Sequence, residues 1–169
     1  MLQLAEIDSP VGRLAIAANE GRICLLHFGG MTNGARAALA RWYPDSTVQA
    51  ATDPGGAVKT LRAYFDGDIK AIDAVQVEMH GTPFQQKVWA ALRRIPVGTT
   101  LSYGRLAQLI NEPSAVRAVG AANGANPVAL IVPCHRVIGS NGTLTGYGGG
   151  LDRKRWLLEH EGVRPQTLF

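Results

Sequence analysis

Cysteine is scarce in this chain of 169 residues, which contains only Cys24 and Cys134. Two cysteines do not make a disulfide-rich secreted scaffold, and we expect both thiols to be reduced. Long apolar runs are also missing, since no stretch approaches the roughly 20 residues that a membrane-spanning helix needs. The first residues lack the basic-then-apolar order of a signal peptide. We therefore expect a cytoplasmic protein without a membrane partner.

Motifs for metals and nucleotides are absent as well. The four histidines are far apart, and none has a zinc-like spacing to either cysteine. The glycine-rich stretch at residues 145–150 lacks the spacing of a phosphate-binding P-loop. We therefore predict no metal and no cofactor.

The charge of the chain differs between its two halves. Residues 1–80 carry seven Lys/Arg and nine Asp/Glu, whereas residues 81–169 carry ten Lys/Arg and four Asp/Glu. The basic excess therefore lies entirely in the second half. Such an excess is typical of a surface that binds a polyanion, but a solvated basic face without a partner would explain it equally well.

The first 80 residues are expected to form an antiparallel sheet with helices. Short apolar runs alternate with turn residues, as in hairpins, and two later segments have helical spacing. The expected strands and helices lie at residues 2–7, 14–17, 23–28, 33–42 and 58–65. Residues 45–56 are predicted to be a loop. A boundary near His80-Gly81 gives two domains, 1–80 and 81–169.

The second half changes to helices with clear start signals. Residues 82–85, Thr-Pro-Phe-Gln, are a capping box with proline at the first helical position. Ser102 is predicted to cap a second helix, and Ser114 a third helix that runs from Ala115 to about Asn123. Two short helices joined by a tight turn are typical of a helix-turn-helix motif, and equally of any other helical hairpin.

One face of the third helix carries almost no side chain. It holds Arg117 and then Gly120, Ala121 and Gly124, which are spaced so that they share that face. Such a face lets the backbone approach another helix closely, or a DNA groove that is too narrow for larger side chains. In the second case Arg117 could enter the base stack.

An apolar run leads into the pair Cys134-His135. Ile131, Val132 and Pro133 precede the pair, and we expect a buried strand that ends at the thiol. The thiolate is the nucleophilic form of cysteine, and a cysteine with a base beside it is the minimal unit of nucleophilic catalysis. Because neighbours on a strand point to opposite faces, an inert buried cysteine is the other interpretation.

These motifs resemble the O6-alkylguanine-DNA alkyltransferases, also called methylated-DNA–protein-cysteine methyltransferases. The resemblance rests on residues 133–137 (Pro-Cys-His-Arg-Val), 147–151 (Tyr-Gly-Gly-Gly-Leu), 102–103 (Ser-Tyr) and 117–120 (Arg-Ala-Val-Gly). It implies an α+β fold, in which a ribonuclease-H-like N-terminal domain with an antiparallel sheet precedes a winged-helix-like C-terminal helical domain with a helix-turn-helix. It also implies binding of double-stranded DNA that contains O6-alkylguanine, flipping of the damaged base, and irreversible transfer of the alkyl group to Cys134.

The resemblance implies roles for the residues of the reaction. Cys134 would be the nucleophile, His135 its general base through a water, and Glu161 the carboxylate that orients the histidine. Asn126 would brace the turn before the cysteine strand. Tyr103 would help to rotate the nucleotide and would hydrogen-bond the base as charge develops on the leaving group. Because a thioether is a poor leaving group, we expect one turnover per molecule, and we expect a monomer.

The resemblance also implies the residues that contact DNA and the flipped base. The expected DNA contacts are Tyr103, Ser114, Arg117, Gly120, Ala121 and Gly124, with Arg117 as an arginine finger that fills the vacated place in the stack. The expected pocket residues are Met79, Val137, Tyr147 and Gly148. Some relatives carry serine in place of Gly148, so that contact would have to come from the backbone. No separate zinc domain is expected before residue 1, and therefore no repair of methylphosphotriesters.

Three other interpretations remain open. A non-catalytic lesion binder would keep the arginine finger but lack the nucleophile. A helix-turn-helix regulator would need large base-reading side chains on the third helix, where the sequence has glycine and alanine. A cysteine hydrolase would need an oxyanion hole, and its helix-turn-helix would have no use. Salt-sensitive binding to DNA would separate the first two from the hydrolase.

Overall fold

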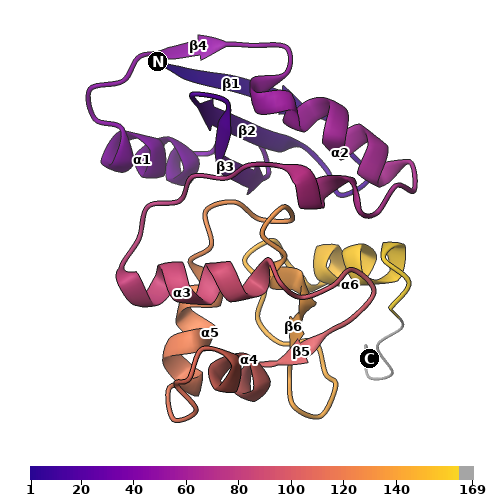
Figure 1. Ribbon diagram of the computed structural model, residues 1–169. Coiled ribbons are helices and arrows are strands. Elements are labelled where there is room, and N and C mark those ends of the chain that lie inside the picture. Colours follow the sequence, from indigo (N-terminus) through magenta and orange to yellow (C-terminus); the bar gives the residue numbers. More distant parts are fainter. Residues whose placement is uncertain (164–169) are drawn as a thin grey trace. The chain divides into compact units, whose positions relative to one another are not determined.

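The computed structural model of the protein describes residues 1–163 and contains two compact units (Figure 1). The first unit consists of Met1–His80 together with Pro127–Ile131. The second consists of Gly81–Asn126 and of the chain from Val132 onward. The expected C-terminal domain extends to residue 169, and residues 164–169 lie outside the described part. No helix within residues 1–163 is both long and apolar enough to cross a membrane.

The first unit is built on a four-stranded sheet. Its strands are β1 (Leu2–Ile7), β2 (Leu14–Asn19), β3 (Arg22–Phe28) and β4 (Val48–Ala50), in the order β3-β2-β1-β4. The first three are antiparallel, because tight turns such as Glu20-Gly21 reverse the chain with positive φ angles of 50° and 79°. The short edge strand β4 runs parallel to β1.

The prediction that residues 45–56 are a loop is wrong at two places. This segment contains β4 and the 3-10 helix η1 (Pro54–Gly56). All three residues of β4 are exposed, so no alternation of apolar and polar side chains marks it as a strand. It is a strand because its backbone pairs with the free edge of β1.

The sheet and its helices share an apolar core. Helix α1 (Asn33–Trp42) begins at Thr32, whose hydroxyl accepts a hydrogen bond from Ala35 N at 3.1 Å. Its residues Ala35 and Leu39 pack against the side chains of Leu2, Ala17, Cys24 and Leu25 in the sheet. Helix α2 (Ala57–Phe65) is followed by the short 3-10 helix η2 (Ala71–Ala74). Each fully buried leucine or valine contributes about 1.5–3 kcal/mol to this core.

The segment Pro127–Ile131 completes the first unit although the sequence around it belongs to the second. Leu26 N donates to Pro127 O at 3.1 Å, and Ala129 N donates to Leu26 O at 3.2 Å. Only an isolated bridge results, and the strand expected to run into Cys134 is not formed. The reason is Leu130, whose φ of 68° is left-handed and turns the chain away from an extended course.

The second unit is mostly helical. Its elements are α3 (Pro83–Leu92), β5 (Leu101–Ser102), α4 (Tyr103–Leu109), α5 (Val116–Gly124), the 3-10 helix η3 (Cys134–Arg136), β6 (Val137–Ile138) and α6 (Leu151–His160). The predicted capping box at α3 is confirmed, with Thr82 and Gln85 bonded reciprocally. Trp89 is buried and its Nε1 donates to Ala122 O at 2.8 Å, which ties α3 to α5. Strands β5 and β6 pair in parallel.

The caps of the two helices that were expected to form the helix-turn-helix differ. Ser102 caps α4 as predicted, because its hydroxyl accepts a hydrogen bond from Arg105 N at 3.1 Å. The prediction that Ser114 caps α5 is wrong, since the N-cap is Ala115 and no side chain caps this helix. A tight turn, closed by Ala115 N donating to Glu112 O at 2.9 Å, places Ser114 one residue too early.

Candidate active site

Cys134 is the first residue of η3 and is held from the C-terminal end of α5. Only 6% of its surface is exposed. The side chain of Asn126 donates to Val132 O at 2.8 Å, and that of Asn123 donates to the carbonyl of Cys134 at 3.4 Å. The chain on both sides of the thiol is therefore fixed by amide side chains from α5 and its end.

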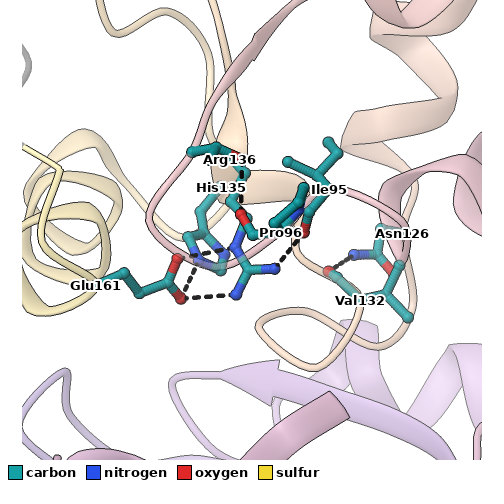
Figure 2. Close-up of polar contacts among 8 residues, drawn as sticks. Ile95, Pro96, Asn126, Val132, His135, Arg136 and Glu161 are labelled. Atoms are coloured by element: carbon teal, nitrogen blue, oxygen red, sulfur yellow. Dashed lines mark hydrogen bonds and ion pairs between the residues drawn. The ribbon is translucent and has the colours of Figure 1, made fainter. Parts of the chain in front are cut away.

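His135, the residue that follows Cys134, forms a buried pair with Glu161 (Figure 2). His135 Nε2 lies 2.8 Å from Glu161 Oε2, and neither side chain is exposed. Glu161 is the C-cap residue of α6, whose last turn therefore sets the position of the carboxylate. Arg136 binds the same carboxylate, with Nε 2.8 Å from Oε1 and Nη2 3.2 Å from Oε2.

The protonation states of this pair follow from the burial and charges around them. Burial alone would raise the pKa of Glu161, but the hydrogen bonds and charges of His135 and Arg136 outweigh it and hold that pKa at about 2. The carboxylate is thus ionised at neutral pH and can only accept, so the neutral imidazole must carry its proton on Nε2. The other nitrogen, Nδ1, is buried and has no hydrogen-bond partner among residues 1–163. It is therefore free to accept a proton.

The resting thiol needs such a base. Burial raises the pKa of Cys134, and the side chains of Asn126 and Tyr147 and the charge of Lys154 only partly offset this. Burial likewise lowers the pKa of His135, against the opposing effect of Glu161. The site thus contains a protonated nucleophile beside an uncharged imidazole, which is the starting state for general-base catalysis.

Lys154 is a buried cation of the same site. Its side chain is fully buried on α6, its Nζ donates to Thr145 O at 2.9 Å, and it lies 5.8 Å from the centre of the Tyr147 ring. Burial lowers the pKa of Lys154 to about 8, against the attraction of the Cys134 thiolate. A cation held here favours negative charge on the sulfur.

The exposed face of α5 carries the residues predicted to contact DNA. Arg117, Ala121 and Gly124 are exposed, and the space around the Cα of Gly124 is open. Gly120 is half-buried because it faces the ring of Tyr103, which would lie 3.8 Å from a Cβ at that position. The hydroxyl of Tyr103 lies 3.5 Å from Thr145 O. The tyrosine therefore sits between α5 and the segment that contains Thr145.

The predicted pocket residues are found in both units. Val137 is buried in β6, Tyr147 is half-buried, and Gly148 is exposed with open space where a Cβ would lie. Met79 is half-buried and belongs to the first unit. Within residues 1–163, no cluster of three or more His, Cys, Asp or Glu side chains is arranged to hold a metal ion.

Three residues of the site were missed by sequence reasoning. They are Asn123, Arg136 and Lys154, all of them buried polar side chains. A signal was present for two of them, because Asn123 follows the buried positions Val119 and Ala122, and Lys154 precedes the buried Leu157 and Leu158 at helical spacing. A polar residue on an otherwise apolar stripe is expected to have a buried partner.

Known proteins share both units. Residues 4–79 match the family model described as "6-O-methylguanine DNA methyltransferase, ribonuclease-like domain", and residues 83–163 match the DNA binding domain of the same family. The methylated-DNA–protein-cysteine methyltransferase of Mycobacterium tuberculosis is 49% identical over 175 residues, which cover 100% of this chain and 99% of that protein. The enzyme of that name from Salmonella typhimurium is 58% identical over 113 residues, 67% of this chain and 66% of the relative.

A solved structure agrees with these matches. The Mycobacterium tuberculosis protein crystallised in complex with DNA has a TM-score of 0.75 and 43% identity, over 94% of this chain and 92% of that chain. The two family models describe a ribonuclease-like domain followed by a DNA binding domain of DNA methyltransferases, in the order of the two units. The chain belongs to the 6-O-methylguanine DNA methyltransferase family. The expected α+β fold and the resemblance stated from the motifs are thereby confirmed.

Proposed function

We propose that this protein repairs O6-alkylguanine in DNA by moving the alkyl group onto its own Cys134. The observation that carries the proposal is a buried pair, in which His135, on the turn that begins with Cys134, lies 2.8 Å from Glu161 at the end of α6. Such a pair provides a base for a thiol that burial keeps protonated. The names of the relatives support the same reaction.

The first step is binding of the damaged duplex to α5. The exposed small residues Ala121 and Gly124 let the helix backbone approach the minor groove, and the basic charge of residues 81–169 attracts the phosphates. Arg117 takes the place of the flipped base in the stack. Tyr103, at the start of α4 and against Gly120, borders the path of the rotated nucleotide. Ser114, exposed just before α5, contacts the phosphate backbone.

The second step is the transfer itself. His135 Nδ1 takes the proton of the Cys134 thiol through a water, and the sulfur attacks the alkyl carbon. A carbon–sulfur bond forms while the bond from that carbon to O6 breaks, and guanine leaves with the electron pair. Tyr103 donates a hydrogen bond to the leaving base, and the proton held by His135 neutralises it. Val137, Tyr147 and Gly148 line the pocket for the base.

The product is a thioether, which is not displaced at neutral pH. Each molecule therefore acts once, as a monomer that binds one lesion. The second unit is the domain that binds DNA and carries the nucleophile, and the first unit, residues 1–80 with Pro127–Ile131, is the accompanying ribonuclease-H-like domain. No metal or redox group enters the balance of this reaction.

The test is intact-protein mass spectrometry after incubation with a duplex that contains one O6-methylguanine. We expect a gain of one methyl group on Cys134, with a matching loss of lesions. Cys24→Ser is the matched control, because Cys24 is also a buried thiol and burial raises its pKa to about 11. The methyl group should persist in Cys24→Ser and disappear in Cys134→Ala.

Two results would overturn the proposal in different ways. Binding of the lesion with unchanged protein mass would make this chain a lesion binder, and the roles of His135 and Glu161 would fail. Repeated loss of lesions per protein molecule would exclude a single turnover and would favour a hydrolytic enzyme.

A further inference from the structure

Arg136 is a buried cation whose guanidinium makes hydrogen bonds within the active site. Only 1% of its surface is exposed. Its Nε and Nη2 donate to the two oxygens of Glu161, and its Nη1 donates to the carbonyl of Ile95 at 2.8 Å (Figure 2). The fork of the guanidinium is thus fixed by three hydrogen bonds to two residues, so it has one orientation.

The carboxylate of Glu161 binds both His135 and Arg136. Its Oε2 accepts hydrogen bonds from His135 Nε2 at 2.8 Å and from Arg136 Nη2 at 3.2 Å, and its Oε1 accepts one from Arg136 Nε. A carboxylate paired with imidazole alone in a buried site would strongly favour the imidazolium, because no other charge would balance it. Arg136 supplies that balance before any proton arrives.

The charges around the imidazole also support a neutral His135 at rest. Among the described residues, Glu161 favours the protonated form of His135, whereas Arg136 and Lys154 oppose it. Lys154 is a second buried cation, on α6. Protonation of His135 at rest would put a third positive charge into this small buried volume.

We propose that Arg136 is a positioning residue for the base: by pairing with both oxygens of Glu161, it fixes the carboxylate on His135 and keeps the resting imidazole uncharged. The proposal rests on the proposed function, because only a base that starts without its proton can take one from Cys134. It assigns to the arginine of the Pro-Cys-His-Arg motif a role in setting the pH at which the protein works.

The test compares Arg136→Gln, which removes the charge, with Arg136→Lys, which keeps it. The rate of methylation of Cys134 is measured from pH 5 to pH 9 with a short duplex that contains O6-methylguanine. Transfer needs neutral His135, so the rate falls as the pH drops below the pKa of that residue. In Arg136→Gln this fall should move to higher pH by about 1 to 2 pH units, with the rate recovering above it. In Arg136→Lys it should stay close to that of the wild type.

A second readout needs no substrate and therefore separates this proposal from the proposed function. NMR titration of histidine-labelled protein reports each imidazole, and His135 is assigned by its substitution. The pKa of His135 should rise in Arg136→Gln. The shift can be seen even if Cys134 never reacts with DNA.

Removal of Arg136 alone leaves Glu161 buried without its cation, which could prevent folding. In that case the effect of the arginine on the pKa of His135 is measured by comparing Glu161→Gln with the double variant Arg136→Gln/Glu161→Gln. Neither variant has an unpaired carboxylate. His135 should titrate at higher pH in the double variant than in Glu161→Gln. Equal titration in that pair, or a loss of rate by the same factor at every pH in Arg136→Gln, would show that Arg136 only supports the fold.

Discussion

Replacement of Lys154 by methionine should stabilise the protein at neutral pH while it slows alkyl transfer. Lys154 is fully buried, and its Nζ donates a hydrogen bond to Thr145 O. A charged group in such a place is retained at a cost in stability, and methionine fills a similar volume without the charge. The cation that favours negative charge on Cys134 is lost at the same time.

The size of the effect follows from the pKa of Lys154, which falls from 10.5 to about 8 in the folded protein. That shift corresponds to about 3 kcal/mol, since one pKa unit is worth about 1.4 kcal/mol. Loss of the hydrogen bond to Thr145 costs about 1 kcal/mol, because this carbonyl belongs to an exposed residue that water can reach. We therefore expect Lys154→Met to raise the free energy of unfolding by about 2 kcal/mol at pH 7.

The pH dependence of stability tests independently whether the buried ammonium destabilises the folded protein. The unfolded chain keeps the lysine proton up to about pH 10.5, whereas the folded protein releases it at about 8. The unfolded state therefore binds more protons in this window, and the stability of the wild type should rise from about pH 8 to pH 10.5 relative to the variant. Urea denaturation at pH 7, 8.5 and 10 measures both chains.

The matched control is Lys87→Met. Lys87 is about half exposed and lies 3.8 Å from Glu112, so its loss should change stability by less than about 1 kcal/mol at any of these pH values. The buried ammonium does not destabilise the protein as we infer if Lys154→Met is less stable than the wild type at pH 7. The same holds if the free energies of unfolding of the two proteins change in parallel up to pH 10.

Three further substitutions test other parts of the second unit. Trp89→Phe removes the donor to Ala122 O and should lower the free energy of unfolding by about 1–2 kcal/mol in urea; an unchanged midpoint would contradict the importance of this bond. Arg117→Ala should weaken binding to a lesion duplex and slow transfer from it, but leave transfer from the free base O6-methylguanine unchanged; an equal loss on both would argue against insertion into the stack. Asn123→Leu should slow the methylation of Cys134 at little cost in stability, because Oδ1 of Asn123 has no hydrogen-bond partner within residues 1–163; an unaltered rate would show that this brace is dispensable.

The sequence could predict those parts of the fold that depend on residues close together in the chain. The capping box at Thr82, the cap at Ser102 and the turn at Glu20-Gly21 each depend on residues within a few positions of one another. The Pro-Cys-His-Arg motif was equally local, and it led to the family. Short-range patterns were misleading at Ser114, where a turn shifted the helix start by one residue.

The parts that sequence could not predict depend on distant partners. Arg136 is buried because Glu161 meets it from 25 residues away, and β4 is a strand because β1 offers it an edge. The expected strand before Cys134 failed because Leu130 adopts a left-handed φ, which no motif in the sequence marks. Such features arise from tertiary pairing, which overrides local propensity.

The membership of Pro127–Ile131 in the first unit has a consequence for synthesis on the ribosome. Leu26 gains its partners Pro127 and Ala129 only when the chain has grown about 50 residues beyond His80. At about 5–20 residues per second, this delay lasts roughly 3–10 s, during which the edge of β3 lacks its pairing at Leu26. We therefore expect a nascent chain that stops at His80 to bind a chaperone rather than to fold on its own. Cys134 emerges only three residues after the segment that closes that edge.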